Sequence, residues 1–139
     1  MKQTMLGIAG LALLSACGAN QEAEIATACL TIMEDPDMKR DIVAASVENE
    51  DFCACASTAL LSLPEDISAN SISAIGLMAE AITEHNGSAE DAFRSISRAA
   101  RADDATPEQI ANHKNIDELG EQLEEVLDGM RTAGGSCPV

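Results

Sequence analysis

Two cysteines separated by a single residue, Cys53 and Cys55, place the strongest limit on how this 139-residue chain can fold. The surrounding sequence has a helical pattern, and positions two apart on a helix point about 200° apart around its axis. The two thiols therefore cannot easily bond each other, and each needs its own partner. Apart from Cys17, which is considered below, the other cysteines are Cys29 and Cys137. Two disulfide frameworks follow: Cys29 with Cys53 and Cys55 with Cys137, or Cys29 with Cys55 and Cys53 with Cys137.

The first 16 residues have the composition of a secretory signal peptide. Lys2 supplies one positive charge, and an apolar run of ten residues follows from Met5 to Leu14. This run is too short to span a bilayer as a helix. A basic start, a short apolar stretch and small residues before a processing point are typical of a signal peptide that is removed on export. We therefore exclude residues 1–16 from the folded domain.

The segment Leu14-Ser15-Ala16-Cys17 resembles the lipobox of bacterial lipoproteins, in which a leucine and two small residues precede an invariant cysteine. The resemblance covers only this N-terminal part of the chain. It implies cleavage between Ala16 and Cys17 and a covalent lipid on Cys17. Each buried methylene contributes roughly 0.8 kcal/mol, so two or three acyl chains on one cysteine would hold the protein on a membrane.

Gly18, directly after Cys17, resembles the pattern of lipoproteins that are sorted to the outer membrane. The resemblance implies a location in the cell envelope, on the outer membrane facing the periplasm, with residues 17–22 as a lipidated polar tether. Once Cys17 is assigned to the lipid, an even set of four cysteines remains, which fits an oxidising compartment. On the loop-entropy model each of two bridges would contribute roughly 3 to 4.5 kcal/mol.

The charge of the chain excludes one class of partner. The chain has 24 acidic residues, 8 lysines and arginines and a formal net charge of −16. Removal of the signal segment would remove one of these basic residues, Lys2, and no acidic residue. Such a surface repels phosphate backbones, and the aromatic residues that could stack on bases are limited to Phe52 and Phe93. We therefore expect no nucleic-acid binding.

Apolar residues recur at helical spacing through residues 23–139, and no alternating strand-like run is present. This pattern predicts a single all-α domain, a small bundle of five or six helices stapled by two disulfides. We expect helices over residues 23–33, 36–48, 52–63, 71–85 and 107–132, with one more after Ser88 and with residues 65–70 left unassigned. The last helix carries apolar residues at alternating spacings of three and four, which suits packing in a bundle: Ile116, Leu119, Leu123, Val126 and Met130.

Several short motifs predict where these helices start and stop. Asp35-Pro36 has the form of an N-cap followed by proline, and Ser88 with Asp91, like Thr106 with Gln109, has the spacing of a capping box. Asn86-Gly87 and Gly134-Gly135 are typical of helix ends.

Motifs that would indicate catalysis are scarce. The chain has no Gly-rich phosphate loop, no serine elbow between glycines and no paired histidines on one helix turn. His85 precedes Asn86-Gly87 and is expected to be a charge at a helix end. His113 lies one turn before Ile116, and Asp117 beside it is the acid that an unfamiliar active site would use. A lone histidine is a poor basis for a catalytic claim, so we expect no enzyme activity.

Cys53 and Cys55 also resemble the Cys-x-Cys pairs that bind copper(I), to which Met33, Met38 or His85 could add ligands. The four cysteines could instead hold zinc, or the pair could exchange thiols. Against these alternatives, thiols outside the cytoplasm tend to oxidise. We therefore expect no metal or cofactor beyond the lipid, and keep soft-metal binding or thiol redox as the alternative function.

Arg94, Arg98 and Arg101 form the one basic stripe in an acidic chain, and we expect them to pair with the protein's own acids rather than with an anionic partner. The anchor and the scarcity of catalytic motifs favour a non-enzymatic binding or envelope-organising module. Its expected partners are the membrane, through the lipid, and a protein.

Overall fold

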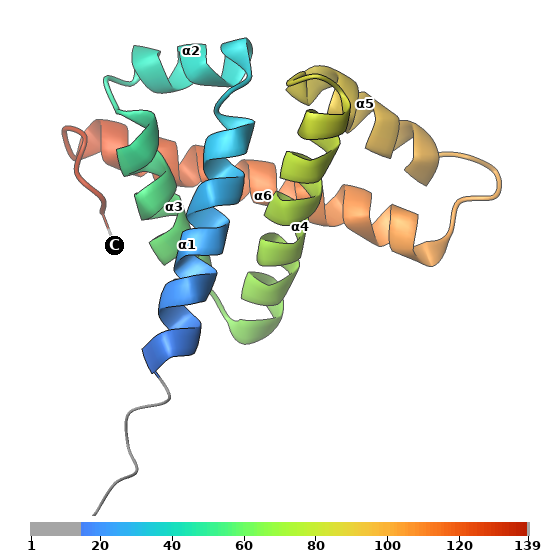
Figure 1. The fold of residues 1–139 in the computed structure, drawn as a ribbon, viewed down its shortest axis with the longest axis horizontal. Helices are drawn as coiled ribbons and strands as arrows, with labels where there is room; N and C mark the ends of the chain where they lie inside the picture. Colours follow the sequence, from blue (N-terminus) through green and yellow to red (C-terminus); the bar gives the residue numbers. More distant parts are fainter. Residues whose placement is uncertain (1–14, 139) are drawn as a thin grey trace, which may run out of the picture.

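A computed structural model describes residues 15–138 and confirms an all-α fold, with no strand in this part of the chain (Figure 1). No helix in the described range is long and apolar enough to cross a bilayer. The six helices are α1 (Ser15–Ile32), α2 (Pro36–Ala44), α3 (Asn49–Ser62), α4 (Glu65–Glu84), α5 (Ala89–Ala100) and α6 (Pro107–Thr132).

The helices pack as a bundle in which the long α6 runs behind α1, α3 and α4 (Figure 1). α1 packs against α3 and α4, while α4 also contacts α5 and α6. The short α2 makes its main contact with α3 and lies at one end of the molecule, opposite the N-terminal end of α1. Each predicted apolar residue of the last helix is buried in this core.

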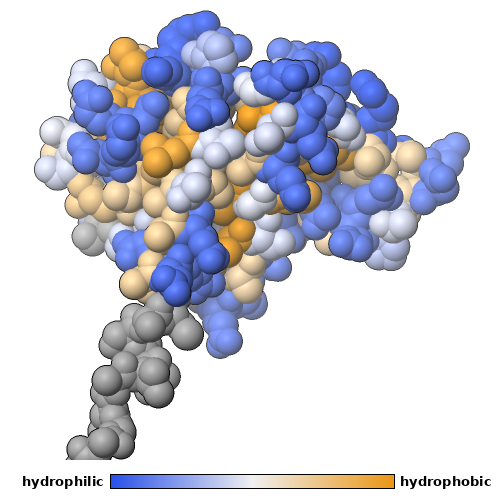
Figure 2. Space-filling model, in the orientation of Figure 1, coloured by the Kyte–Doolittle hydropathy of each residue, from blue (hydrophilic) through white to orange (hydrophobic). Residues whose placement is uncertain are grey.

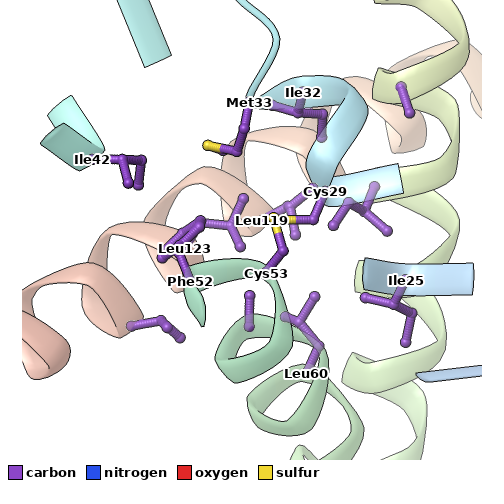
Figure 3. Packing of buried hydrophobic residues seen from close by; sticks show 14 of the residues in the cluster. Ile25, Cys29, Ile32, Met33, Ile42, Phe52, Cys53, Leu60, Leu119 and Leu123 are labelled. Atoms are coloured by element: carbon purple, nitrogen blue, oxygen red, sulfur yellow. A yellow bond between two sulfur atoms is a disulfide. The ribbon is translucent and has the colours of Figure 1, made fainter. Parts of the chain in front are cut away.

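The disulfides are Cys29 with Cys53 and Cys55 with Cys137, so the first of the two predicted frameworks is present. The first bridge lies in the middle of the hydrophobic core, beside Leu119 (Figure 3). The second ties the C-terminal tail to the other side of α3. The two bridges diverge from one helix because residues 53 and 55 point to different sides of it.

Most of the predicted stop and start signals are confirmed. The Thr106 hydroxyl accepts from the Gln109 N–H, and the Gln109 side chain accepts from the Thr106 N–H, which completes a capping box. α4 ends with Asn86 in the left-handed region (φ 56°), and the Gly87 N–H donates to the Ile82 carbonyl. α6 ends in the same way at Gly134 (φ 67°). These bonds satisfy carbonyls that a helix end leaves without partners.

Three predicted boundaries are wrong by four residues or more, and α3 begins at Asn49 rather than at residue 52. α1 begins at Ser15 rather than at residue 23, so the polar segment 17–22 belongs to this helix. Except for Gly18, that segment has residues compatible with helix, and the Thr58 hydroxyl donates to the Glu22 carboxylate at 3.1 Å, which joins it to α3. α4 begins at Glu65, in the segment left unassigned, because acids in its first turn favour a helix N-terminus.

The third boundary concerns α2, which ends at Ala44 instead of near residue 48. Ser46 adopts a left-handed conformation (φ 58°), and the Val47 N–H donates to the Ile42 carbonyl at 3.3 Å. This is a helix-ending motif that usually has glycine where Ser46 stands. Burial of Val47 and Ile42 supports the turn, which the sequence alone did not indicate.

Asp35 caps two helices with one carboxylate. Its Oδ1 accepts from the backbone N–H groups of Asp37 (2.8 Å) and Met38 (3.1 Å) at the start of α2. Its Oδ2 accepts from the N–H of Ala89, the first residue of α5, at 2.8 Å. Ser88 caps α5 only in part, through the Asp91 N–H at 3.2 Å, so the predicted reciprocal capping box is absent there.

The Asp35 side chain is buried, with 6% of the residue exposed. Burial by itself raises the pKa of this carboxyl, but the N–H groups of Ala89, Met38 and Asp37 stabilise the charged form. Their combined effect is larger, so the pKa lies below its ordinary value of 3.8. The charged Asp35 therefore holds the N-termini of α2 and α5 together.

Replacement of Asp35 tests this double cap. We expect Asp35→Ala to lower the free energy of unfolding by about 3 kcal/mol, because it removes a cap and leaves N–H groups buried without acceptors. Asp35→Asn can still cap α2 through its side-chain oxygen, but its NH2 group cannot accept from the Ala89 N–H. We expect this variant to lower the free energy of unfolding by about half as much. The exposed Asp37→Asn, with the same charge change, should stay within about 0.5 kcal/mol of wild type. Urea denaturation measures all three, and equal effects of Asp35→Asn and Asp37→Asn would contradict the assignment.

The stability that the charge of Asp35 contributes should depend on pH. Because the folded-state pKa of Asp35 is lowered, its charge contributes stability that is fully present above the ordinary pKa and is lost as the pH falls through the folded-state pKa. The stability difference between wild type and Asp35→Asn should be constant from about pH 5 to pH 8 and should shrink in stronger acid. A difference that grows below pH 4 would show that the carboxylate is not stabilised in the folded state.

The two disulfides should differ in their accessibility to a reductant. Cys29 and Cys53 are 0% and 1% exposed, whereas Cys137 is exposed on the C-terminal tail. Mild reduction of the folded protein, followed by alkylation and peptide mass mapping, should modify Cys55 and Cys137 first. In denaturant all four cysteines should react together. Modification of Cys29 and Cys53 at the same rate as the other pair in the native protein would contradict this order.

Candidate functional site

The predicted chemical residues do not gather into one cluster. Cys53 and Cys55 are each joined to a different partner, so the thiolates that copper, zinc or thiol exchange would need are bound in disulfides. Among residues 15–138 no group of three or more His, Cys, Asp or Glu side chains is placed to hold a metal ion. His85 is the C-cap residue of α4, in keeping with a position at a helix end. Cys17 lies in α1. The part of the predicted signal peptide that precedes Ser15 lies outside the described residues.

The structure does bring His113 and Asp117 together. The Nδ1 atom of His113 lies 3.2 Å from Oδ2 of Asp117, one turn further along α6. The His113 ring also packs on Phe93 of α5, with ring centroids 5.5 Å apart. Its Nε2 atom is buried and has no hydrogen-bond partner. A catalytic histidine held by a carboxylate at Nδ1 presents Nε2 to its substrate, and here that atom is covered.

The basic stripe on α5 is only partly paired. Arg94 forms ion pairs with Glu90 and, at 3.4 Å, with Asp91, both on its own helix. No ion pair of Arg98 or Arg101 is present among the described residues, and both side chains are exposed. The predicted pairing with the protein's own acids therefore applies to Arg94 alone.

A groove that no sequence motif indicates lies along α6 in the described part of the chain, and we call it the α2–α6 groove. It consists of two adjoining hollows of about 580 Å³ and about 380 Å³, which share Met38, Gly120 and Leu123 in their linings. The first hollow lies between α2 and α6, and the second lies between α5 and α6. Both have a size typical of binding sites for small ligands or for a few side chains of a partner.

Apolar side chains from all six helices or their ends supply the groove's floor. Met33 follows α1, Met38 belongs to α2, Phe52 to α3 and Leu123 to α6. The second hollow adds Met78 of α4 and Phe93 of α5, among others. Figure 3 shows Met33 and Ile42 on the side of the core nearest α2. The face drawn in Figure 2, with α6 behind it, is mostly hydrophilic with scattered hydrophobic residues. Met38 and Met78, both half-buried, give this floor an adaptable surface.

Gly120 lies where the two hollows meet, in the middle of α6. A Cβ atom built there would have no other atom within 4 Å, so the space above it is open. Glycine inside a helix costs about 1 kcal/mol relative to alanine, and no close approach within the protein requires it at this position. Gly129 on the same helix differs, because Pro138 of the tail packs directly against it.

The rim of the groove is acidic. Asp41, Glu124 and Asp128 line the first hollow, together with one basic residue, Arg131. The second hollow has further acids on its rim: Glu90, Asp117 and Glu121. Arg131 is already paired with Asp128 at 2.7 Å. The groove thus combines an apolar floor with a negative border.

Comparison of the chain with protein-family models, with curated proteins and with solved structures finds no match. The function therefore has to be inferred from the residues themselves.

Proposed function

We propose that the protein is a lipid-anchored binding module of the cell envelope, held on a membrane through Cys17, which binds a partner protein in the α2–α6 groove. The observation that carries this proposal is the groove itself, an apolar surface bordered by charge and open to solvent. Concave surfaces that combine apolar lining with a few charged groups are common places for proteins to bind partners or ligands. The outer membrane, with the domain in the periplasm, is the location that Gly18 favours.

The placement of anchor and groove supports this proposal. Cys17 lies near the N-terminal end of α1, and Met33 of the groove follows the other end. At a rise of 1.5 Å per residue the two are about 24 Å apart along the helix. α2 likewise lies at the end of the molecule opposite the start of α1 (Figure 1). A domain anchored at Cys17 would therefore present its groove on the side far from the lipid, where a periplasmic protein can reach it.

The state of the chemical groups favours binding over catalysis or metal chemistry. Nε2 of His113, the atom a general base would use, is covered. Cys53 and Cys55 would require reduction of a disulfide before they could bind copper or exchange thiols. Neither alternative gains support from a specific feature of the described residues, whereas the groove needs no rearrangement to accept apolar side chains.

The anchor can be tested with Cys17→Ser, since a serine hydroxyl cannot replace the thiol that receives the lipid. We expect the variant to accumulate as an uncleaved precursor or to leave the membrane fraction, while wild type stays with it. Membrane fractionation and intact mass measure both effects. Normal processing and unchanged fractionation of Cys17→Ser would count against lipidation.

The groove can be tested in cells with a photo-crosslinking amino acid at position 120. We expect a discrete protein adduct from position 120, because the side chain would project into the groove without a clash. The matched control is position 76, where Gly76 is also helical, exposed and free of close contacts but does not line the groove. Equal adducts from both positions, or none from position 120, would contradict a protein partner in the groove.

A further inference from the structure

We propose that the occupant of the α2–α6 groove is a cationic amphipathic helix of the partner protein. This inference rests on the proposed binding function and names the chemistry of the partner. Three observations carry it: the apolar floor, the length of the groove along α6, and the carboxylates on its rim that have no partner.

The groove has the dimensions of a site for one helix. Its lining follows α6 from Ile116 to Arg131, which at 1.5 Å per residue is about 22 Å, or four helical turns. A helix of about 14 residues would cover that length and would place its apolar side chains at intervals of three and four. The flexible, half-buried side chains of Met38 and Met78 can adapt to the aliphatic residues of such a helix.

The charges on the rim favour a positively charged partner. Asp128 is paired with Arg131, Glu90 with Arg94, and Asp117 with His113. The other rim acids, Asp41 on α2 and Glu121 and Glu124 on α6, take part in no ion pair among the described residues. Lysines or arginines beside the apolar stripe of a bound helix would meet these three carboxylates.

The same charges disfavour two other occupants. A second copy of this chain would bring its own acidic surface, with a net charge of −16, against the acidic rim. An anionic lipid surface would be repelled for the same reason. A basic helix is the occupant that gains from both the floor and the rim.

Designed peptides separate these cases. The probes are two fluorescent 14-residue amphipathic helices with the same leucine face, one with lysine and one with glutamate on the polar face. We expect the Leu/Lys peptide to bind the purified domain at least tenfold more tightly than the Leu/Glu peptide in fluorescence anisotropy. This preference should decrease in 0.5 M salt, because screening weakens exposed charge pairs.

Two pairs of variants show whether binding uses the groove. Gly120→Leu should fill the open space and raise the Kd of the Leu/Lys peptide at least tenfold, whereas Gly76→Leu should change it less than twofold. Glu121→Lys with Glu124→Lys should also raise the Kd at least tenfold. Glu80→Lys with Glu84→Lys, exposed acids on α4 outside the groove, makes the same change in net charge and should have at most a twofold to threefold effect. Circular dichroism checks that each variant is folded.

Equal binding of the two peptides, or equal loss in the groove variants and their controls, would overturn this inference. So would self-association of the free domain that Gly120→Leu abolishes, because a second copy would then occupy the groove. If a position-120 crosslink forms in cells while the lysine peptide shows no preference, the proposed binding function stands and only the basic helix is wrong. Without a specific crosslink, the binding function itself fails.

Discussion

The arrangement of the proposed binding surface depends on one buried carboxylate, that of Asp35. Asp35 caps two helix N-termini. Its side-chain oxygens accept hydrogen bonds from three backbone N–H groups, two in α2 and one in α5. Burial of a charge is costly, but the charge-assisted bonds and the positive ends of two helices offset this cost. Met38 and Asp41 follow on α2, and Glu90 and Phe93 follow on α5. Asp35 therefore links the start of α2, beside the first hollow, to the start of α5, beside the second.

The features that could be predicted from the sequence are those with local causes. Helical periodicity and the spacing of Cys53 and Cys55 predicted an all-α bundle and restricted the disulfides to two frameworks. The cap at Thr106 and the turn at Asn86-Gly87 depend on residues next to one another and are confirmed. The second bond of Asp35 could not be predicted, because Ala89 is 54 residues away and nothing in its own sequence marks it as a donor.

The groove could not be predicted for a related reason. Its floor comes from residues whose common face exists only after folding, and each one alone fits an ordinary core position. The sequence allows Met33 and Met38 as copper ligands beside Cys53 and Cys55. In the structure both side chains instead belong to the apolar lining of the groove. Gly120 is a local indication of the groove, since glycine in the middle of a helix lowers stability and no contact within the protein compensates for that loss. Its open surroundings show that no internal contact requires it.

The disulfides suit the proposed arrangement, in which the domain is held at one end and binds a partner at the other. A force applied at Cys17 would pass along α1 to Cys29 and, through the buried bridge, into Cys53 of α3. Since Phe52 beside that bridge also lines the groove, the covalent link joins α1 to the groove's floor. α2 stands outside this covalent frame and depends on Asp35 and on its contact with α3. The wall that α2 forms is therefore the part of the groove that can adjust to a partner with the least cost to the rest of the fold.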